Sequence, residues 1–435
     1  MNTQEKNTLK RETQRRNLWL QFVNGLCSLT QSWIKALVTL VYGLLAWFIW
    51  VCRDDVFHFD NYEMLNRSNF SQLILVLLAI GFVWLIIMFG TPYGSKRIND
   101  NLWRVGIINH AGESPTLIKK SKDKQNLNIE ILEFETCGIP KSEFENQQSK
   151  IEAALNIHIV KVEQGKNMQR VILHTVSGNC DLPKVIHWKD EYLSDKNFEL
   201  ILGKSFLGME TVNLAKIPHI LLGGSTGSGK SVLLKLLVMQ CVKKGAIVYV
   251  ACFKCGVDFP PIWHKQCTII TEETALLELL TDLEAELESR KEILRLSYYS
   301  NIDELNKNAE TKLPRLIFAC DEIAELFDKT ALSKERKELV TQIEAKISKI
   351  ARQGRALGIH LILATQRPDA RILEGQIRSN LDFRVCGRAD NILSQIILDN
   401  GDAADKIPKH AQGRFLTHNG TVFQAYWFDE TAVFL

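Results

Sequence analysis

A run of eight residues near the middle of this 435-residue chain has the composition of a phosphate-binding loop. It reads Gly224-Ser225-Thr226-Gly227-Ser228-Gly229-Lys230-Ser231. The run fits the pattern G-x-x-x-x-G-K-[ST] at every defined position. Apolar residues 220–222 precede it as a buried strand does, and apolar residues with helical spacing follow it from Val232. In such a loop, glycines let the backbone amides point inward, and the helix N-terminus attracts the charge of a phosphate.

The spacing assigns a role to each part of this loop. We expect all eight residues to contact the phosphates of ATP, with Lys230 reaching the β- and γ-phosphates and Ser231 binding Mg²⁺ through its hydroxyl. ATP and Mg²⁺ are therefore the predicted cofactors. The alternative is a glycine-rich turn that opens an ordinary helix, and the strand and helix that flank the loop disfavour it.

Polar side chains end two later apolar segments. Residues 316–322 read Leu-Ile-Phe-Ala-Cys-Asp-Glu, so two acids stand at the tip of a strand. Asp321 is expected to hold Mg²⁺, and Glu322 to orient or deprotonate the attacking water. Gln366 ends the segment from His360, where a neutral amide can sense the γ-phosphate. A buried strand with a polar exit is the alternative for residues 316–322, but a phosphate loop upstream favours an ATPase.

These motifs together resemble the motor domain of the FtsK/SpoIIIE family of DNA translocases. The resemblance extends from Gly203 to Phe428 and rests on residues 214–219 before the phosphate loop, on Asp321-Glu322, and on residues 351–368, which contain Ala-Thr-Gln-Arg-Pro. It implies a RecA-like fold, ATP hydrolysis in a homo-hexameric ring, and translocation along double-stranded DNA.

Ring ATPases complete each site with an arginine from the neighbouring subunit. Arg384 is similar to a family arginine at the start of the next strand, and Arg388 follows closely, so both are candidates. Relatives often have Asp-Ser-Arg where this chain has Leu393-Ser394-Gln395, and this departure leaves the arginine that acts on the neighbour unassigned.

The segment order predicts an α/β fold with a RecA-like P-loop motor and a mainly parallel sheet. Two transmembrane helices and a small α/β module should precede the motor. We expect a basic arm at 1–32, the transmembrane helices at 33–90, the module at 91–200 and the motor at 201–435. In the module, strands are predicted at 129–134, 157–162 and 171–176, with a helix at 142–155.

Four further elements are predicted in the motor. Long helices are expected at 272–296 and 333–356, and residues 301–312 are expected to form a solvated loop. A C-terminal hairpin of residues 414–416 and 422–427 should turn tightly at Asn419-Gly420.

Two apolar segments near the N-terminus are long enough to cross a bilayer. Residues 33–52 contain one lysine, and residues 73–90 contain no charge. Cations concentrate before the first segment and after the second, whereas the connector 53–70 is rich in acids. The positive-inside rule therefore predicts a two-pass protein of the cell membrane with both termini in the cytoplasm. A cleaved signal peptide and a pair of buried core helices are the disfavoured alternatives.

Composition says little about partners. The net charge of +3 is too small to indicate nucleic-acid binding, and ten cysteines in an inward-facing domain are expected to stay reduced. Cys252 and Cys255 form a C-x-x-C pair, but the absence of a second pair at ligand spacing disfavours zinc.

Two segments are candidates for DNA contact. The first is the basic helix 333–356, for which a solvated surface is the alternative. The second is the segment with Arg367, Arg371 and Arg378, which could line the channel of a ring and contact phosphates. An ordinary surface loop is its alternative.

The expected architecture points to one use of the motor. Chromosome-segregating relatives generally carry about four spans, a long linker and a C-terminal winged helix, whereas two spans are predicted here and the chain is expected to stop directly after the motor, without a winged helix. It looks like the TcpA-type coupling proteins of conjugative elements, which implies DNA, single- or double-stranded, a relaxase and transfer-channel proteins as partners. The alternatives are a chromosome-segregation or cell-division translocase and, in a different class, the ATPase of a protein-secretion system.

Overall fold

This computed structural model describes residues 3–52, 67–124, 126–253, 258–310, 312–329, 332–366 and 375–433. The chain forms two compact units, Met1–Cys180 and Asp181–Leu435, and each is described by itself.

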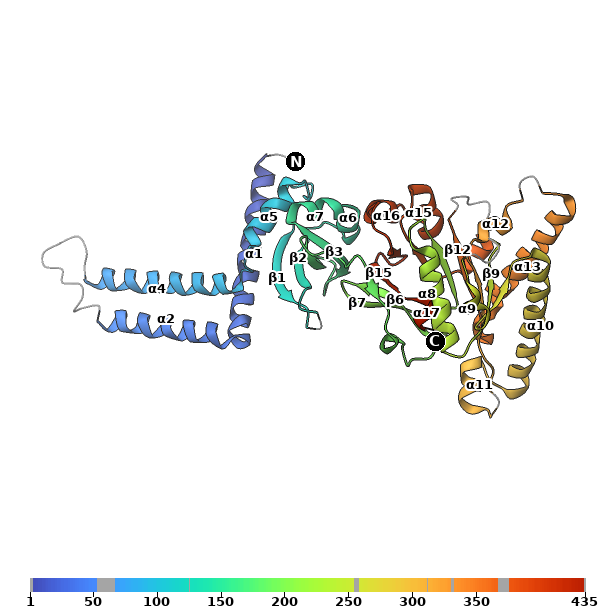
Figure 1. The fold of residues 1–435 in the computed structure, drawn as a ribbon. Helices are drawn as coiled ribbons and strands as arrows, with labels where there is room; N and C mark the ends of the chain where they lie inside the picture. The colour runs from blue at the N-terminus through green and yellow to red at the C-terminus, as the bar shows by residue number, and fades with distance from the viewer. Residues whose placement is uncertain are drawn as a thin grey trace. The chain divides into compact units, whose positions relative to one another are not determined.

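The first unit begins with three long helices (Figure 1). Helix α1 spans Thr3–Gln31, α2 spans Trp33–Val51 and α4 spans Arg67–Gly90. Residues 33–51 and 72–90 are each 19-residue helices that are long and apolar enough to cross a membrane. The two helices contact each other, since the Tyr42 hydroxyl donates to the Leu78 carbonyl (2.8 Å).

A small four-stranded antiparallel sheet completes this unit. Its strands lie in the order β1-β2-β4-β3, and their bounds are Thr116–Lys122, Glu130–Glu135, Arg170–Ser177 and Ile157–Gln164. Helices α5 (Ser95–Arg104), α6 (Lys141–Asn146) and α7 (Gln148–Leu155) supply Leu102, Phe144 and Ile151 to the same core as Phe134 and Leu173.

The structure confirms the three predicted strands of this module and corrects its helix. The segment predicted as one helix is two, because the chain leaves helical geometry at Gln147, and Pro140 caps the first of them. Strand β1 was not predicted, since in its sequence T-L-I-K-K-S-K only Leu117 is buried and the alternation is too weak to indicate a strand.

The second unit is built on one mixed sheet. Six strands run parallel in the order β10-β9-β11-β12-β8-β13, and β14, β15, β6 and β7 continue the sheet antiparallel. The parallel strands are Thr268–Ile270, Ile247–Ala251, Leu316–Cys320, Ile359–Thr365, His219–Gly223 and Phe383–Cys386. The others are Arg414–Thr417, Val422–Trp427, Glu199–Ser205 and Gly208–Asn213, and the short β5 (Ile186–His187) pairs with β15.

Helices cover both faces of the parallel strands. Along β12, Leu361 and Leu363 belong to the core that includes α10 (Glu273–Ser297) and α13 (Lys334–Leu357). The alternate residues Ile362 and Ala364 belong to the core of α8 (Lys230–Lys243). Strands β8, β11 and β12 are completely buried, as strands covered on both faces must be.

The remaining helices of the described residues are short. They are α9 (Pro261–His264), α11 (Ile302–Asn308), α12 (Ile323–Phe327), α14 (Gly375–Asn380), α15 (Asn391–Leu398), α16 (Asp402–Lys406) and α17 (Glu430–Val433), with a 3₁₀ turn at Asp190–Tyr192. The prediction of an α/β fold with a mainly parallel RecA-like sheet, preceded by two apolar helices and a small module, is therefore confirmed.

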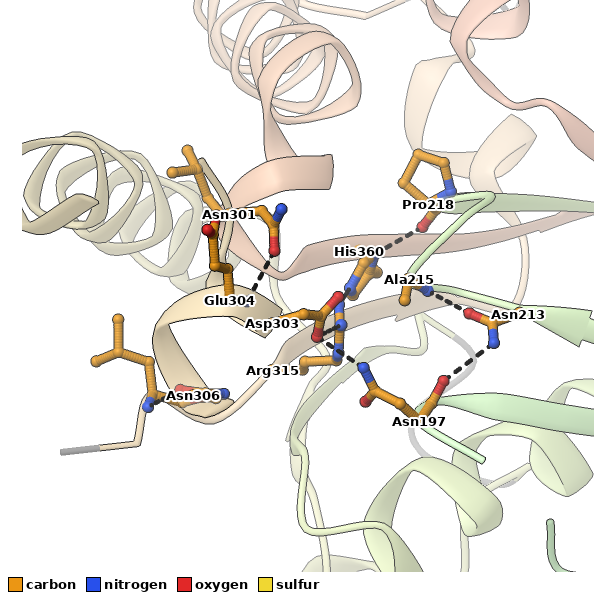
Figure 2. A network of polar contacts seen from close by, with 12 residues as sticks. Asn197, Asn213, Ala215, Pro218, Asn301, Asp303, Glu304, Asn306, Arg315 and His360 are labelled. Carbon is orange, nitrogen blue, oxygen red and sulfur yellow. Dashed lines mark hydrogen bonds and ion pairs between the residues drawn. The ribbon is translucent and has the colours of Figure 1, made fainter. Parts of the chain in front are cut away.

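The segment 301–312 is not the solvated loop that the composition suggested. Helix α11 buries Ile302 and Leu305, and the Asn301 side chain accepts a hydrogen bond from the Glu304 amide as its N-cap. Figure 2 shows why it is held: Asp303 pairs with Arg315 and accepts from the Asn197 amide (2.8 Å).

The second unit begins at Asp181, about twenty residues before the motor boundary expected from the sequence. Side chains of the C-terminal hairpin hold this segment. Arg414 pairs with Asp181 (3.1 Å) and donates to the Leu182 carbonyl (2.9 Å), and the Gln424 amide donates to the Lys184 carbonyl (2.9 Å).

The hairpin of β14 and β15 forms as predicted, but its turn differs. Only Gly420 has a positive φ (83°), whereas a primed turn would need one at Asn419 as well. The Gly420 amide donates to the Thr417 carbonyl (2.9 Å), so a glycine with positive φ follows an ordinary turn.

Candidate nucleotide-binding site

Three neighbouring strands end at one edge of the sheet. The register pairs Cys320 of β11 with Leu363 of β12, and Leu363 with Leu221 of β8. Since the strands are parallel, the residues that follow each of them lie at the same edge. The phosphate loop, the acid pair and Gln366 are these residues, so the fold gathers motifs that are up to 140 positions apart in the chain.

Glycines give the loop a shape that other residues would not adopt. Gly224, Gly227 and Gly229 have φ values of 156°, 76° and 98°. A Cβ on Gly224 would lie 2.5 Å from the Ser228 hydroxyl, and one on Gly229 would lie 3.1 Å from the Gly413 backbone. Space and backbone conformation therefore both select glycine at these two positions.

The loop presents unused amides at a helix N-terminus. The Ser225 amide donates to the Arg388 carbonyl (2.7 Å) and the Ser228 amide to the Ser225 carbonyl (3.0 Å). Within the described part of the chain, five other amides of the loop donate to no protein group: those of Thr226, Gly227, Gly229, Lys230 and Ser231. Free amides around the start of α8 are the arrangement that binds phosphate, so this loop fits a nucleotide.

Asp321 connects the two central motifs. Its carboxylate lies 3.1 Å from the Lys230 ammonium and accepts a hydrogen bond from the Ser231 hydroxyl (2.9 Å), and its carbonyl also accepts from Lys230. Lys230 is 3% exposed and Asp321 1% exposed, so the lysine charge is balanced in a site from which water is excluded. The Asp321 carboxylate and the Ser231 hydroxyl are adjacent hard oxygen ligands, which is the ligand type that Mg²⁺ prefers.

Glu322 is held by the end of β12. Both carboxylate oxygens accept from the backbone N–H of Gln366 (3.0 and 3.2 Å), and one also accepts from the Thr365 hydroxyl (3.0 Å). Burial raises the pKa of the Glu322 carboxyl, although the Lys230 charge and these hydrogen bonds oppose the shift. Sequence reasoning missed Thr365, whose only signal was its place between the apolar strand and Gln366.

Gln366 also reaches the phosphate loop. The Thr226 hydroxyl donates to the side-chain oxygen of Gln366 (2.9 Å). The backbone N–H of Gln366 donates to the Glu322 carboxylate. One residue thus joins the loop, the acid and β12.

The two candidate arginines bind groups of their own chain. The Arg388 guanidinium donates to the Thr226 carbonyl (2.5 Å) and the Lys409 carbonyl (2.7 Å), so it lies directly against the phosphate loop. Arg384 donates to the Leu381 carbonyl (2.9 Å) and pairs with Asp399 (2.6 Å), away from the loop.

The remaining candidates from the sequence are the cysteines and the arginines after β12. In the described ranges no group of three or more His, Cys, Asp or Glu could hold a metal, and Cys255 lies outside them. Cys241, Cys267, Cys320 and Cys386 are free thiols, and burial raises their pKa values. Arg367 and Arg371 also lie outside the described residues, and Arg378 pairs with Asp399 (3.4 Å).

The basic helix α13 faces acids of α10. Arg336 binds Glu273 (2.6 Å), Lys346 binds Glu284 (2.6 Å), and Lys349 binds both Glu284 (2.6 Å) and Glu288 (3.0 Å). In Figure 1 the two helices lie side by side over the sheet. These cations therefore have protein partners, which supports the alternative that the helix is not a DNA surface.

Fold and site together define a RecA-like P-loop ATPase. The FtsK/SpoIIIE family profile matches residues 185–370. A solved structure of the pCW3 conjugation coupling protein TcpA, in its monomer form with ATPγS, is 35% identical, with a TM-score of 0.59 over 79% of this chain and 98% of that one. The chain belongs to the FtsK/SpoIIIE family of ATPases.

Curated relatives agree with this membership. The DNA translocase FtsK of Chlamydia pneumoniae is 31% identical over 252 residues, which are 50% of this chain and 30% of that protein. FtsK of Treponema pallidum is 29% identical over 280 residues, 60% of this chain and 34% of that protein. The match thus spans about a third of the length of these relatives.

Proposed function

We propose that this protein is a membrane-anchored, ATP-dependent DNA translocase that acts as a coupling protein and delivers DNA to a conjugative transfer channel. The observation that carries the proposal is the likeness to the coupling protein TcpA over 98% of that chain. The family of the curated relatives, which are DNA translocases, supports DNA as the substrate to be moved.

The geometry supports distinct roles for the site residues in ATP hydrolysis. The five free amides and Lys230 hold the phosphates, once Lys230 exchanges Asp321 for the nucleotide. Ser231 and Asp321 would hold Mg²⁺, which would supply positive charge beside the phosphate oxygens. Glu322 accepts the proton of the attacking water, and its raised pKa brings its basicity closer to neutral pH.

Gln366 has the position of a reporter in this mechanism. It contacts Thr226 of the loop and Glu322 at the same time. A change at the γ-phosphate that moves the loop would therefore be passed to β12 and to the segment that follows it. That segment carries Arg367 and Arg371, which we propose as DNA-phosphate contacts on the basis of the sequence.

Membrane anchoring rests on the two apolar helices of the first unit. Each is 19 residues long, which matches the hydrocarbon core of a bilayer. The distribution of Lys and Arg favours two passes with both termini in the cytoplasm. A homo-hexameric ring and contacts with a relaxase and channel proteins complete the proposal by analogy with the family.

A second candidate function is chromosome segregation or cell division. It is favoured by the name that the curated relatives share, DNA translocase FtsK.

A transfer assay separates the two functions. In a host that carries the element of this gene, we expect Lys230→Ala to lower DNA transfer at least about hundredfold, since one lost electrostatic contact to the reacting phosphate costs that much. The matched control is Lys204→Ala on β6, where the lysine is exposed. Undiminished transfer with Lys230→Ala would reject the coupling role, and a defect in chromosome partition instead would favour the second candidate.

The purified protein allows a direct test of the motor. ATPase activity of the full chain in detergent should rise on addition of duplex DNA, and Lys230→Ala should abolish it while Lys204→Ala does not. ATPase activity that ignores DNA would contradict the translocase assignment.

A further inference from the structure

We infer that α1 lies in the plane of the bilayer surface and binds anionic lipid through an apolar stripe. The stripe consists of Leu18, Trp19, Phe22, Val23 and Leu26. The inference rests on the proposed membrane anchoring and adds a lipid-binding element to it.

The stripe occupies one side of α1. Its residues follow the spacing i, i+1, i+4, i+5, i+8, which places them on a single face of a helix. Trp19 is 64% exposed and Leu18 is 49% exposed, although both are large apolar side chains. The rings of Trp19 and Phe22 stack within the stripe, with centroids 6.1 Å apart.

The side of α1 that adjoins the stripe packs against protein. There Gly25 is so close to α4 that a Cβ would lie 1.9 Å from the Ile86 carbonyl oxygen, and a Cβ on Gly90 would lie 1.8 Å from the Gln21 carbonyl oxygen. On the same side the Asn17 amide donates to the Thr116 hydroxyl of β1 (3.2 Å). Helix α1 therefore packs Gly25, Asn17 and the half-buried Leu20 on its protein side and leaves Leu18, Trp19, Val23 and Leu26 exposed, although an exposed apolar stripe is unfavourable in water.

The position of α1 identifies a bilayer as the occupant of this face. Only Ser32 separates α1 from α2, and Gly90 at the end of α4 lies against α1. The Lys35 ammonium donates to the Phe89 carbonyl (2.9 Å), so α2 starts where α4 ends. The end of α4 therefore lies against the part of α1 that carries the stripe, close to the start of α2.

Charge favours anionic lipid over a second copy of the chain. Residues 3–16 of α1 contain five basic and two acidic residues. The basic residues are Lys6, Lys10, Arg11, Arg15 and Arg16. Two such helices placed face to face would repel, whereas anionic headgroups attract each cation, and a helix that combines Lys and Arg with exposed Trp and Leu is typical of a membrane interface.

Photocrosslinking of the full chain tests this. The protein is reconstituted in vesicles of phosphatidylcholine with phosphatidylglycerol, with p-benzoylphenylalanine in place of Phe22. We expect lipid adducts at this position and none at the matched control position, Leu296 of α10, which is apolar and 63% exposed in the motor unit. A crosslinked dimer in place of lipid adducts, or no adduct, would overturn the inference.

The basic residues provide a second arm. We expect adducts at position 22 to fall at least about threefold in vesicles of phosphatidylcholine alone and, equally, in the variant Lys10→Gln/Arg11→Gln/Arg15→Gln. Adducts that are unchanged in both would overturn the role of anionic lipid. Extraction by alkaline carbonate separates the two proposals: a protein that stays in the membrane without adducts refutes only this inference, whereas a protein that is extracted refutes the anchoring as well.

Discussion

Two opposing effects set the protonation of Glu322. Burial favours the neutral carboxyl, while Lys230, Thr365 and the Gln366 amide favour the charged form, and burial is the larger effect. The result is a carboxylate whose pKa lies above its ordinary value and which two neighbouring strands hold in place.

We expect ATP hydrolysis to fall as the pH is lowered toward the raised pKa of Glu322, because the protonated carboxyl cannot accept a proton from water. The loss should begin at a higher pH than the ordinary carboxyl value of 4.5 would give. Glu322→Gln should bind ATP with little turnover, at least about hundredfold below the wild type, and should lose this acid limb of the profile. Measurement of kcat against pH for both proteins checks the assignment, and a variant with normal turnover would contradict it.

Two buried histidines at the other end of the strands are held neutral. The His219 ring accepts from the Leu361 amide (3.0 Å) and donates to the Ala351 carbonyl (3.0 Å). His360 contacts the Pro218 carbonyl and Arg315, as Figure 2 shows. Burial lowers the pKa of His219 to about 4 and that of His360 well below its ordinary value.

Acid should therefore destabilise the motor unit. Below about pH 6.5 the unfolded chain gains a proton on each histidine, while folded His219 gains one only near pH 4, so the stability present above pH 6.5 is lost in between. The expected loss is about 1.4 kcal/mol per pH unit for each histidine. Urea unfolding of the detergent-solubilised protein over this range measures it.

The matched variants are His219→Asn and His187→Asn, of which His187 is exposed. His219→Asn keeps an acceptor for the Leu361 amide, starts less stable and should lose less stability on acidification. Equal acid sensitivity of the two variants would contradict this account.

Among the helices, α13 has a strongly basic sequence, and its contacts with α10 show what several of these cations bind. Seven Lys and Arg residues between 334 and 355 suggest an anion-binding surface when read along the chain. Three of them instead lie against glutamates of α10. Their charge is used between two helices of the same unit.

We expect Lys346→Gln/Lys349→Gln to leave DNA-stimulated ATPase activity within about twofold of the wild type. Because both pairs are partly exposed and screened by solvent, the unfolding free energy should change little. Arg371→Gln, in the segment after β12, should instead weaken DNA binding and reduce its salt dependence. If the double lysine variant loses DNA affinity, α13 does contact DNA and the present account of this helix is wrong.

In the proposed hexameric ring, each ATP site could be completed by an arginine of the neighbouring subunit. Arg388 already contacts the phosphate loop of its own chain, and Arg384 is occupied by Asp399 and the Leu381 carbonyl. The structure thus supports Arg388 as a residue that positions the loop within one subunit.

Mixed rings test this. Subunits with Lys230→Ala and subunits with Arg388→Ala, produced together, should show no recovery of ATPase activity if Arg388 acts in its own chain, since neither kind has a complete site. Arg388→Ala alone should raise the KM for ATP by about tenfold, the effect of one lost hydrogen bond near a charged ligand. Recovery in the mixture would assign Arg388 to the neighbouring site.

Much of the fold follows from the chain read residue by residue. The phosphate-loop pattern, the apolar strands at 220–222, 316–320 and 360–365 and the two apolar helices are local signals, and the structure places strands and helices there. Helix α11 was missed because Ile302 and Leu305 are its only buried residues, too few to produce a helical pattern. The break at Gln147 was missed for a similar reason, since no proline or glycine marks it.

The family, the chemistry of the phosphate loop and the order of the strands along the chain could be inferred from residue types at short, defined spacings. The partner of each polar side chain could not, and it became known only from the folded chain. Arg388 on Thr226, Gln366 between the loop and Glu322, and Gly25 of α1 against α4 all depend on groups that are distant in the sequence. The physical reason is that the type of a polar group is fixed by the sequence. Its interaction energy depends on which groups the fold places within hydrogen-bond distance, about 3 Å.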